Sequence, residues 1–197
     1  MTNLAYKYVH ERPKEMLDGV IYMMASPILN HVRVNRNIAR IFDRHFKGRR
    51  CEVFGDPTMV FLTEKDRVVP DVTVVCSKDI LKKEGVVGTP DLIVETLSPS
   101  TAKHDKGYKK DLYECCGVKE YWIADIEKLL IETYWLEDGK YQLNNVYTIL
   151  PDYEARDMTE EKLAQYPTKF KTSLFDDLII DLEEIFEDII SQGEENA

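Results

Sequence analysis

The sequence predicts an α/β fold in which helices flank one mixed β-sheet. Apolar runs rich in β-branched residues, such as VVPDVTVV and DLIVETL, are typical of strands that are buried on both faces. A polar segment with helical character, TAKHDKGYKKDLYECC, lies between DLIVETL and the next apolar run, EYWIAD, which is the order of a parallel crossover. In the segment 129–149, two apolar runs surround Glu137-Asp138-Gly139, and this pattern predicts an added β-hairpin.

The N-terminal part of the chain predicts a strand and then a helix. Asp18-Gly19 is a turn signal, and the apolar run VIYMMA after it predicts a strand or hairpin arm that ends at Pro27. The segment NHVRVNRNIARIFDRHF begins with Asn30, a predicted helix cap, and places its apolar residues on one helical face until Gly48 ends it. Three strand candidates follow, CEVFG, TMVFL and VVPDVTVVC, and then the loop SKDILKKEGVVGTP.

The C-terminal part is predicted to form an extension of the same domain. Gly117 is expected to end the second helix as a left-handed residue. The chain after Pro151 is more polar and acidic, and FDDLIIDLEEIFEDII has the periodicity of a C-terminal helix that packs on the domain. No repeat or low-complexity linker is present. Residues 1–197 therefore predict a single domain, with about 150–197 as its acidic extension.

Composition limits the classes of function. The 197 residues are enough for one buried core, with 44% hydrophobic and 31% charged residues. The net charge of -10 disfavours a protein that binds DNA through general electrostatic attraction, but it does not exclude a nuclease, because charge can be local. The N-terminus has no apolar core of a signal peptide, and no apolar run approaches the ~20 residues that span a membrane.

The cysteines predict no metal site. Cys51, Cys76, Cys115 and Cys116 show neither a CxxC motif nor a Cys/His zinc pattern. Cys76 ends an apolar strand and is expected to be a thiol in the core, and the adjacent pair at the helix end is also expected to be free. Free thiols are consistent with a reducing cytoplasm, so we expect a cytoplasmic protein.

Two acids stand out because they interrupt buried strands. Asp71 and Glu95 each lie within an apolar run, where an ionised carboxylate is costly unless a partner such as a metal ion compensates its charge. Glu95 follows Asp71 by 24 residues, which suits a strand–loop–strand unit that brings both to one end of a sheet. Mg²⁺ binds one or two carboxylates together with waters and substrate phosphate. Lys109, on the next predicted helix, can return over the sheet to orient a water or stabilise an oxyanion.

These residues resemble those of a family of restriction-endonuclease-like proteins, long labelled as of unknown function, within the PD-(D/E)xK nuclease superfamily. The pieces that match are LDGVIYMMASP with His31, then VPDVTVV, VETLSPST, HDKGYKKDLY and GVKEYWIAD, in the family's order. The FDDLIIDLEEIF tail is also similar. The resemblance implies a restriction-endonuclease-like mixed sheet, with Pro70-Asp71 as the PD element and Glu95 as the second acid. It also implies Mg²⁺, with Mn²⁺ as a substitute, and DNA as the substrate.

One departure from the superfamily pattern concerns the lysine. Thr96 and Leu97 follow Glu95, so the lysine expected two residues later is absent. The family resemblance aligns Lys109 with a lysine relocated to the following helix, and Lys106 and Lys110 are its alternatives. On a helix, Lys109 and Tyr113 are i,i+4 neighbours on one face, which makes Tyr113 a further candidate near the substrate.

Three other residues are candidates for supporting the site. Asp105 precedes Lys109 by four residues and is expected to pair with it or to cap the helix. His31 is a candidate contact for phosphate or for a metal's water, and a capping or buried histidine is the equal alternative. The family resemblance includes an acid at Glu15, although a surface role is the simpler expectation. Asp91, in a second Pro-Asp pair, is expected only to start its strand.

The leading functional hypothesis is a Mg²⁺-dependent endonuclease that hydrolyses DNA phosphodiester bonds, in which Asp71 and Glu95 hold the metal and Lys109 positions or activates the water. The net charge and the missing lysine after Glu95 favour an alternative, a non-catalytic or regulatory domain that retains the nuclease fold. A metal-dependent phosphohydrolase with another phosphate substrate is the third reading. Symmetric cleavage of duplex DNA would suit a homodimer, with the hairpin 129–149 and the tail as its expected interface.

Overall fold

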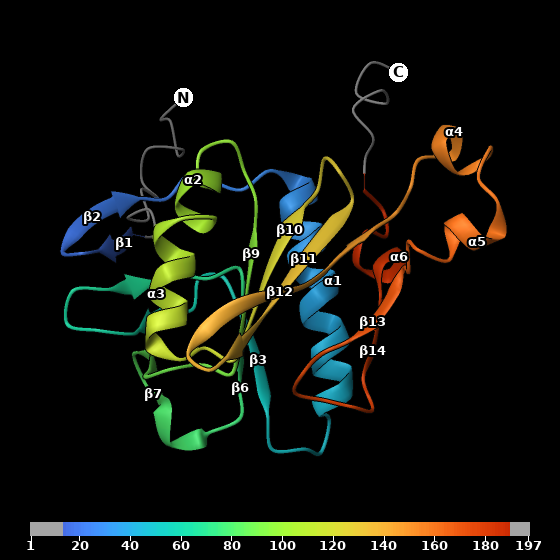
Figure 1. Ribbon diagram of the computed structural model, residues 1–197. Helices are drawn as coiled ribbons and strands as arrows, with labels where there is room; N and C mark the ends of the chain where they lie inside the picture. The colour runs from blue at the N-terminus through green and yellow to red at the C-terminus, as the bar shows by residue number, and fades with distance from the viewer. Residues whose placement is uncertain (1–13, 190–197) are drawn as a thin grey trace, which may run out of the picture.

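A computed structural model describes residues 14–189 of the protein. The fold is built around a central mixed sheet (Figure 1). The strand order is β12-β11-β10-β9-β6-β3. Only β9 and β10 run parallel among these neighbours, and α2 and α3 connect them, which confirms the predicted crossover. The strands are β3 (Glu52–Gly55), β6 (Val72–Val75), β9 (Leu92–Thr96), β10 (Glu120–Asp125), β11 (Leu130–Glu137) and β12 (Lys140–Thr148).

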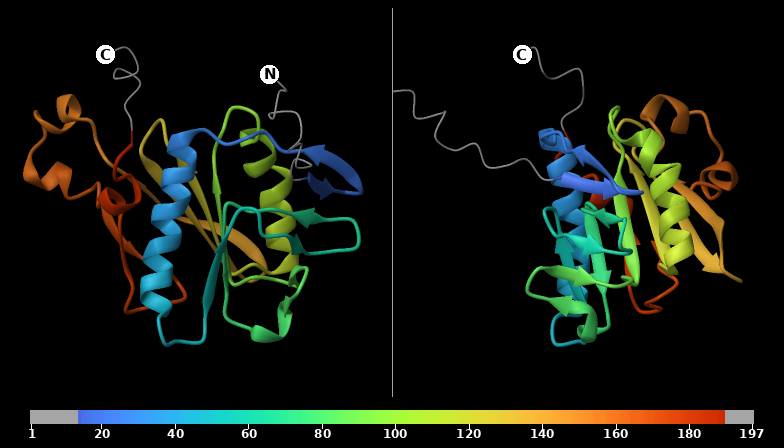
Figure 2. Two further views of the ribbon diagram at one scale, coloured as in Figure 1. Left: turned by 180° about the vertical axis from the view of Figure 1, so that it is seen from behind. Right: turned by 90° about the vertical axis from the view of Figure 1, so that its left-hand side faces the viewer.

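Helices cover both faces of this sheet (Figure 2). The helix α1 (Leu29–Phe46) packs on the face to which Leu92 and Val94 point. The helix α3 (Tyr108–Cys116) packs on the opposite face, with Ile93. Because successive residues of β9 point to opposite faces, this strand is buried on both, as its apolar sequence predicts.

A second, smaller sheet lies beside the first, in the order β2-β1-β5-β4-β8-β7. The sequence predicts only part of it, because several of its strands have two or three residues. The run VVPDVTVV is split between the two sheets, so that the turn at 69–71 is an irregular corner, and the expected loop 77–90 contains a hairpin. The strands are β1 (Lys14–Leu17), β2 (Val20–Met23), β4 (Val60–Phe61), β5 (Arg67–Val68), β7 (Leu81–Lys82) and β8 (Gly85–Val87), with the 3-10 helix η2 (Lys78–Ile80).

The first two of the three predicted helices differ in their bounds from the observed ones. The first begins after Ile28, with no side-chain cap, so the predicted cap at Asn30 is wrong. The second is divided into α2 (Ala102–Asp105) and α3, because the chain bends at Gly107, where an added Cβ would lie 2.8 Å from the carbonyl oxygen of Lys103. Gly117 ends α3 with φ of 83°, which confirms the predicted left-handed residue.

The C-terminal helix is much shorter than predicted. Ile179–Asp181 forms β14, which pairs with β13 (Lys169–Lys171), and only α6 (Leu182–Ile185) is helical in that region. The side chain of Asp181 caps α6 by accepting a hydrogen bond from the amide of Glu183. Strand pairing satisfies the backbone before this cap and buries Ile180, whereas Ile179 points to the surface. The short helices α4 (Asp152–Ala155) and α5 (Glu160–Leu163) precede this part, and residue 190 of the predicted helix lies outside the described residues.

Cys51 and Cys76 form a disulfide, so the expectation of a free core thiol at Cys76 is wrong. The two residues follow the register of β3 and β6, in which Glu52 lies opposite Val75, and are therefore direct neighbours across the sheet. The two cysteines are 25 residues apart in the chain, so their proximity could not be predicted from local sequence patterns. Cys115 and Cys116 are free thiols, as predicted. Within residues 14–189, no helix is long and apolar enough to cross a membrane. The homodimer and its interface remain predictions.

Asp66 ties the hairpin of β1 and β2 to the helical layer. Its buried carboxylate accepts hydrogen bonds from the backbone amide of Asp18 at 2.8 Å, the hydroxyl of Thr63 at 2.6 Å and the hydroxyl of Tyr108 at 2.8 Å. Burial alone would raise the pKa of Asp66, but these hydrogen bonds hold it below its usual value of 3.8.

We expect Asp66→Ala to lower the free energy of unfolding by about 1–3 kcal/mol at neutral pH, because buried donors lose their acceptor. Since the folded-state pKa lies below the unfolded value, this stabilisation is present above pH 3.8 and is lost as the pH falls through the folded-state pKa. Urea unfolding at neutral pH and at about pH 3 measures both effects, with the exposed Asp157→Ala as control. An equal cost at both pH values would contradict this assignment.

Candidate active site

Asp71 and Glu95 come together at one end of the central sheet. Val72 and Val94 are the last paired residues of β6 and β9 at this end, so Asp71 lies across from Glu95 one position further along. The backbone amide of Thr96 donates a hydrogen bond to Oδ2 of Asp71 at 2.7 Å. The two predicted acids are therefore neighbours, as the strand–loop–strand spacing predicts.

The carboxylate of Asp71 is oriented mainly by α1. His31 Nε2 lies 2.7 Å from Oδ1 of Asp71, and Nδ2 of Asn35 donates to the same oxygen at 2.8 Å. The hydroxyl of Thr96 donates to Oδ1 of Asn35 at 2.6 Å and so fixes the amide. Burial would lower the pKa of His31, but its hydrogen bond to Asp71 and the nearby charges of Asp71, Asp105 and Asp56 raise it overall. The histidine is thus a partner of Asp71 rather than a helix cap.

Glu95 faces the other helical layer. Its Oε1 accepts hydrogen bonds from Nζ of Lys109 at 3.1 Å and from the hydroxyl of Tyr113 at 2.6 Å. The residue is only 3% exposed, so its charge is poorly solvated. Burial and the carboxylates of Asp105, Asp71 and Glu15 raise the pKa of Glu95, and the ammonium of Lys109 opposes this shift.

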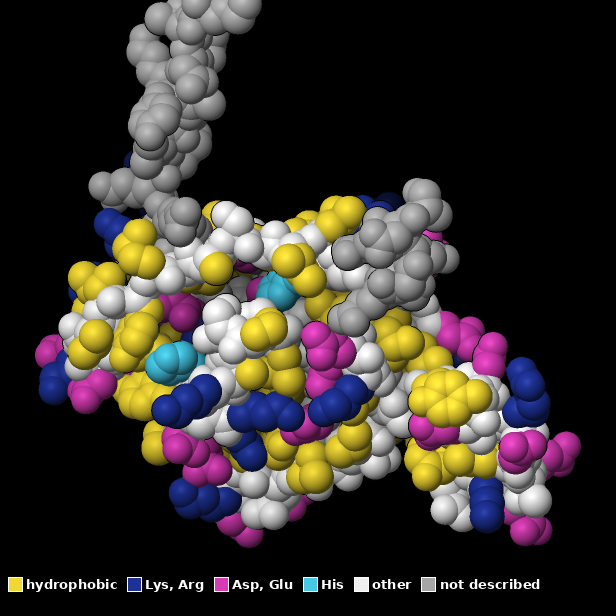
Figure 3. Space-filling view, turned by 90° about the horizontal axis from the view of Figure 1, so that it is seen from above, with side chains coloured by type: hydrophobic (Ala, Val, Ile, Leu, Met, Phe, Trp, Pro, Cys, Tyr) yellow, Lys and Arg dark blue, Asp and Glu magenta, His cyan; other side chains and the backbone are white. Residues whose placement is uncertain are grey.

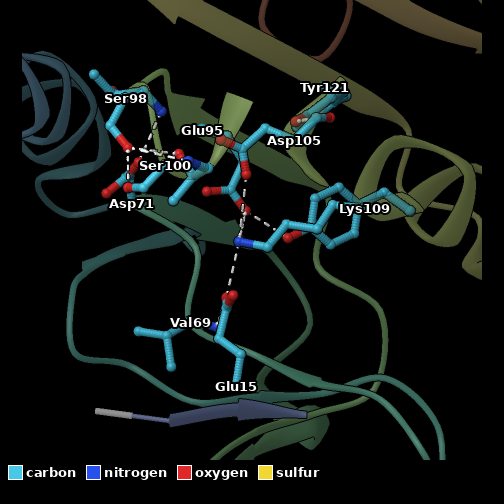
Figure 4. Close-up of polar contacts among 12 residues, drawn as sticks. Glu15, Val69, Asp71, Glu95, Ser98, Ser100, Asp105, Lys109 and Tyr121 are labelled. Carbon is cyan, nitrogen blue, oxygen red and sulfur yellow. Dashed lines mark hydrogen bonds and ion pairs between the residues drawn. The ribbon is translucent and has the colours of Figure 1, made fainter. Parts of the chain in front are cut away.

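The ammonium of Lys109 lies among three carboxylates (Figure 4). Its Nζ is 2.8 Å from Oε1 of Glu15, 3.1 Å from Oε1 of Glu95 and 3.6 Å from Oδ1 of Asp105. Burial lowers the pKa of Lys109, but the charges of Glu95, Glu15 and Asp105 outweigh it and raise the pKa far above its usual value. Lys109 is therefore an ammonium ion at any physiological pH.

The two alternative lysines point elsewhere. Lys106 is exposed and pairs with Glu132 of β11 at 2.8 Å. Lys110 lies over the ring of Tyr134, with its Nζ 3.7 Å from the ring centroid. Of the three candidate lysines, only Lys109 contacts the acidic cluster, by which we mean Glu15, Glu95 and Asp105. The geometry therefore selects Lys109.

Glu15 is buried, so the surface role expected for it is wrong. It is 7% exposed, and besides its contact with Lys109 its Oε1 accepts a hydrogen bond from the amide of Val69 at 2.8 Å. This bond joins β1 to the segment that leads into Asp71. The sequence gives little sign of this role, because the burial of Glu15 depends on β5 and α3, which are distant in the chain.

Asp105 reaches the cluster from the end of α2. It is 1% exposed, and its Oδ1 has no hydrogen-bond donor among the described residues, apart from the ion pair with Lys109. Its backbone carbonyl accepts a hydrogen bond from the hydroxyl of Tyr121, a core residue of β10. Burial and the nearby carboxylates raise the pKa of Asp105, against the effect of Lys109. The predicted pairing of Asp105 with Lys109 is thus present.

Two residues near the site were not predicted. Asn35 follows His31 by four residues, and this helical spacing was the signal that could have identified it. Asp56, just after β3, lies close enough for the charge of Asp71 to add to burial in raising its pKa. No sequence pattern pointed to Asp56. By contrast, the carboxylate of Asp91 accepts hydrogen bonds from the amide of Cys76 at 2.7 Å and from Nζ of Lys119 at 2.7 Å. Asp91 thus has the structural role expected for it, directly before the strand β9.

The donor set fits a hard divalent cation. Asp71 and Glu95 offer carboxylate oxygens, and the cluster holds more acidic groups than the single Lys109 compensates. Among residues 14–189, no three His, Cys, Asp or Glu side chains form a ready-made metal cage. Mg²⁺ does not require one, because it keeps several waters and uses one or two carboxylates with substrate phosphates. Asp71 and Glu95 are the residues that could hold it.

Known proteins place the chain in a family. The family model Uma2, described as "Putative restriction endonuclease", matches residues 8–162. The uncharacterized protein slr1290 of Synechocystis sp. is 30% identical over 151 residues, which cover 75% of this chain and 76% of that protein. The crystal structure of a putative nuclease belonging to DUF820 from Anabaena variabilis has a TM-score of 0.65 at 17% identity, covering 88% of this chain and 89% of that one. That similarity confirms the predicted fold class, and the match to the family model shows that the chain belongs to the Uma2 family.

Proposed function

We propose that the protein is a Mg²⁺-dependent endonuclease that hydrolyses phosphodiester bonds of DNA. The observation that supports this best is the convergence at one end of the sheet of Asp71, just before β6, Glu95 of β9 and Lys109 of α3. Two carboxylates and one ammonium are the groups that metal-dependent phosphodiester hydrolysis needs. Membership of a family described as "Putative restriction endonuclease" supports the same activity.

Each residue has a distinct part in the proposed reaction. Asp71 and Glu95 would hold the cation, with His31 and Asn35 fixing the orientation of Asp71. Bound Mg²⁺ would lower the pKa of a coordinated water and offset the charge that develops on the phosphoryl group. Tyr113 orients Glu95 through its hydroxyl.

Lys109 acts as a fixed positive charge. Its raised pKa means that it does not accept the proton of the attacking water. Instead it donates hydrogen bonds, so it can orient the water or stabilise the developing negative charge on the phosphate. Its attachment to Glu15 and Asp105 keeps the ammonium in place without a lysine on the strand of Glu95.

Cleavage of plasmid DNA tests the proposed activity. The purified protein with Mg²⁺ or Mn²⁺ is expected to convert supercoiled plasmid to nicked or linear forms. Asp71→Ala is expected to reduce this to background, because the cation loses a ligand. Asp152→Ala, which changes an exposed residue of α4, should cleave like the wild type. Equal cleavage by Asp71→Ala, or cleavage of neither this plasmid nor single-stranded DNA, would refute the proposal.

Substitution of adjacent lysines tests the part of Lys109. We expect Lys109→Met to lower kcat by roughly 10²–10³-fold, the usual effect of losing one donor to a developing negative charge. Lys110→Met, one residue away but directed at Tyr134, should keep nearly full activity. Steady-state cleavage of a labelled oligonucleotide measures both, and thermal melting verifies folding. Equal losses in the two variants would contradict the assignment.

Metal binding can be measured without catalysis. In a calorimetric titration with Mn²⁺, we expect the wild type to bind and Asp71→Asn to bind roughly 10–100-fold more weakly. Asp152→Asn serves as the matched control. If the wild type binds no divalent cation, the reading as a non-catalytic domain with the nuclease fold is favoured instead.

A further inference from the structure

An uncharged strand edge lies directly beside the acidic cluster. The four residues of β2, Val20, Ile21, Tyr22 and Met23, are exposed by 53%, 64%, 39% and 56%. Among the strands of residues 14–189, β2 is the outermost one of its sheet. Viewed from above, hydrophobic side chains gather at one side of this face beside a histidine (Figure 3). Exposed edge strands usually bear charged residues, so this composition needs an explanation.

Tyr22 links this edge to the site. In the register of the hairpin it lies opposite Glu15, so both side chains project from the same face of the hairpin. Glu15 binds the ammonium of Lys109. The ring of Tyr22 meets the ring of His104 on α2, with centroids 5.1 Å apart and planes at 61°. His104 immediately precedes Asp105, so the two rings form an aromatic rim at the acidic cluster.

This rim is suited to a base and unsuited to a phosphate backbone. The strand 20–23 has no Lys or Arg, and the chain has a net charge of -10. Phosphate contacts in nucleic-acid complexes come mainly from Lys and Arg. The partly exposed ring of Tyr22 offers a flat apolar surface on which a nucleobase can stack, and such stacking is worth about 1–3 kcal/mol per base.

We propose that Tyr22, beside His104, stacks an unpaired base next to the scissile phosphate, so that the substrate is single-stranded DNA or an unpaired stretch within a duplex. The bases of an intact duplex are stacked on one another and present no free face to Tyr22. This inference rests on the proposed nuclease function and specifies its substrate class. Tyr22 is a binding residue, and it lies outside the group that holds the cation.

Fluorescence anisotropy with a labelled single-stranded oligonucleotide in Ca²⁺ tests the proposal. Wild-type protein is expected to bind the single strand more tightly than a duplex of the same sequence. Tyr22→Ala should weaken single-strand binding by roughly 5–150-fold, from the loss of one stacked base. Tyr22→Phe keeps the ring and should bind like the wild type. Tyr153→Ala, which removes a 72% exposed tyrosine on α4, is the matched control.

An abasic substrate separates stacking from a structural effect. A set of oligonucleotides carries one abasic position each, at successive places along the strand. For one of them, wild-type protein should bind as weakly as Tyr22→Ala binds the intact strand. Tyr22→Ala should bind that abasic oligonucleotide and the intact strand with equal affinity. Equal losses on single strand and duplex, or no abasic effect at any position, would overturn the proposal. So would a wild-type dimer that Tyr22→Ala converts to a monomer with unchanged DNA binding, because β2 would then pair copies of the chain.

The two proposals can fail separately. If plasmid cleavage depends on Asp71 while Tyr22→Ala and Tyr22→Phe behave alike on every substrate, the base-stacking inference is wrong and the nuclease function stands. If neither single-stranded nor duplex DNA is cleaved in Mg²⁺ or Mn²⁺, the nuclease function itself is refuted.

Discussion

The ammonium of Lys109, enclosed by Glu15, Glu95 and Asp105, is the interaction on which the arrangement of this protein depends. The three carboxylates come from β1, β9 and α2, and all are buried. Without a cation between them they would repel one another in a poorly solvated position, at a cost of several kcal/mol. One lysine of α3 therefore fixes how the hairpin, the central sheet and the helical layer meet. The same contacts place the ammonium 3.1 Å from Oε1 of Glu95.

The connection extends to Asp71 through the backbone. Glu15 accepts a hydrogen bond from the amide of Val69, two residues before Asp71, where the chain leaves the small sheet for the central one. On the other side, α1 supplies His31 and Asn35 to the carboxylate of Asp71. The segment 69–71 is thus bound on one side to α1, through Asp71, and on the other side to Glu15, which binds Lys109 of α3. This arrangement explains how a short irregular segment can place a carboxylate reproducibly beside Glu95.

The sequence allowed prediction of those parts that depend on local pattern. The β-branched runs predicted the central strands, and the acids within them predicted Asp71 and Glu95 as neighbours. The burial of Glu15 and the disulfide of Cys51 with Cys76 were missed, because each depends on pairing between segments far apart in the chain. The C-terminal helix was overestimated for a related reason. Ile179–Asp181 has apolar residues that suit a helix, but pairing with β13 satisfies its backbone instead.

The missing lysine after Glu95 has a spatial explanation. Leu97 takes the position two residues on, and it packs against the apolar cluster that includes Tyr113 of α3. The ammonium arrives at Glu95 from that same helix, one turn before Tyr113. Because Lys109 remains protonated, it can replace the strand lysine as a positive charge but not as a base. In the proposed reaction, Lys109 would therefore supply its positive charge to the phosphoryl group or to the attacking water, and Glu95 would remain a ligand of the cation.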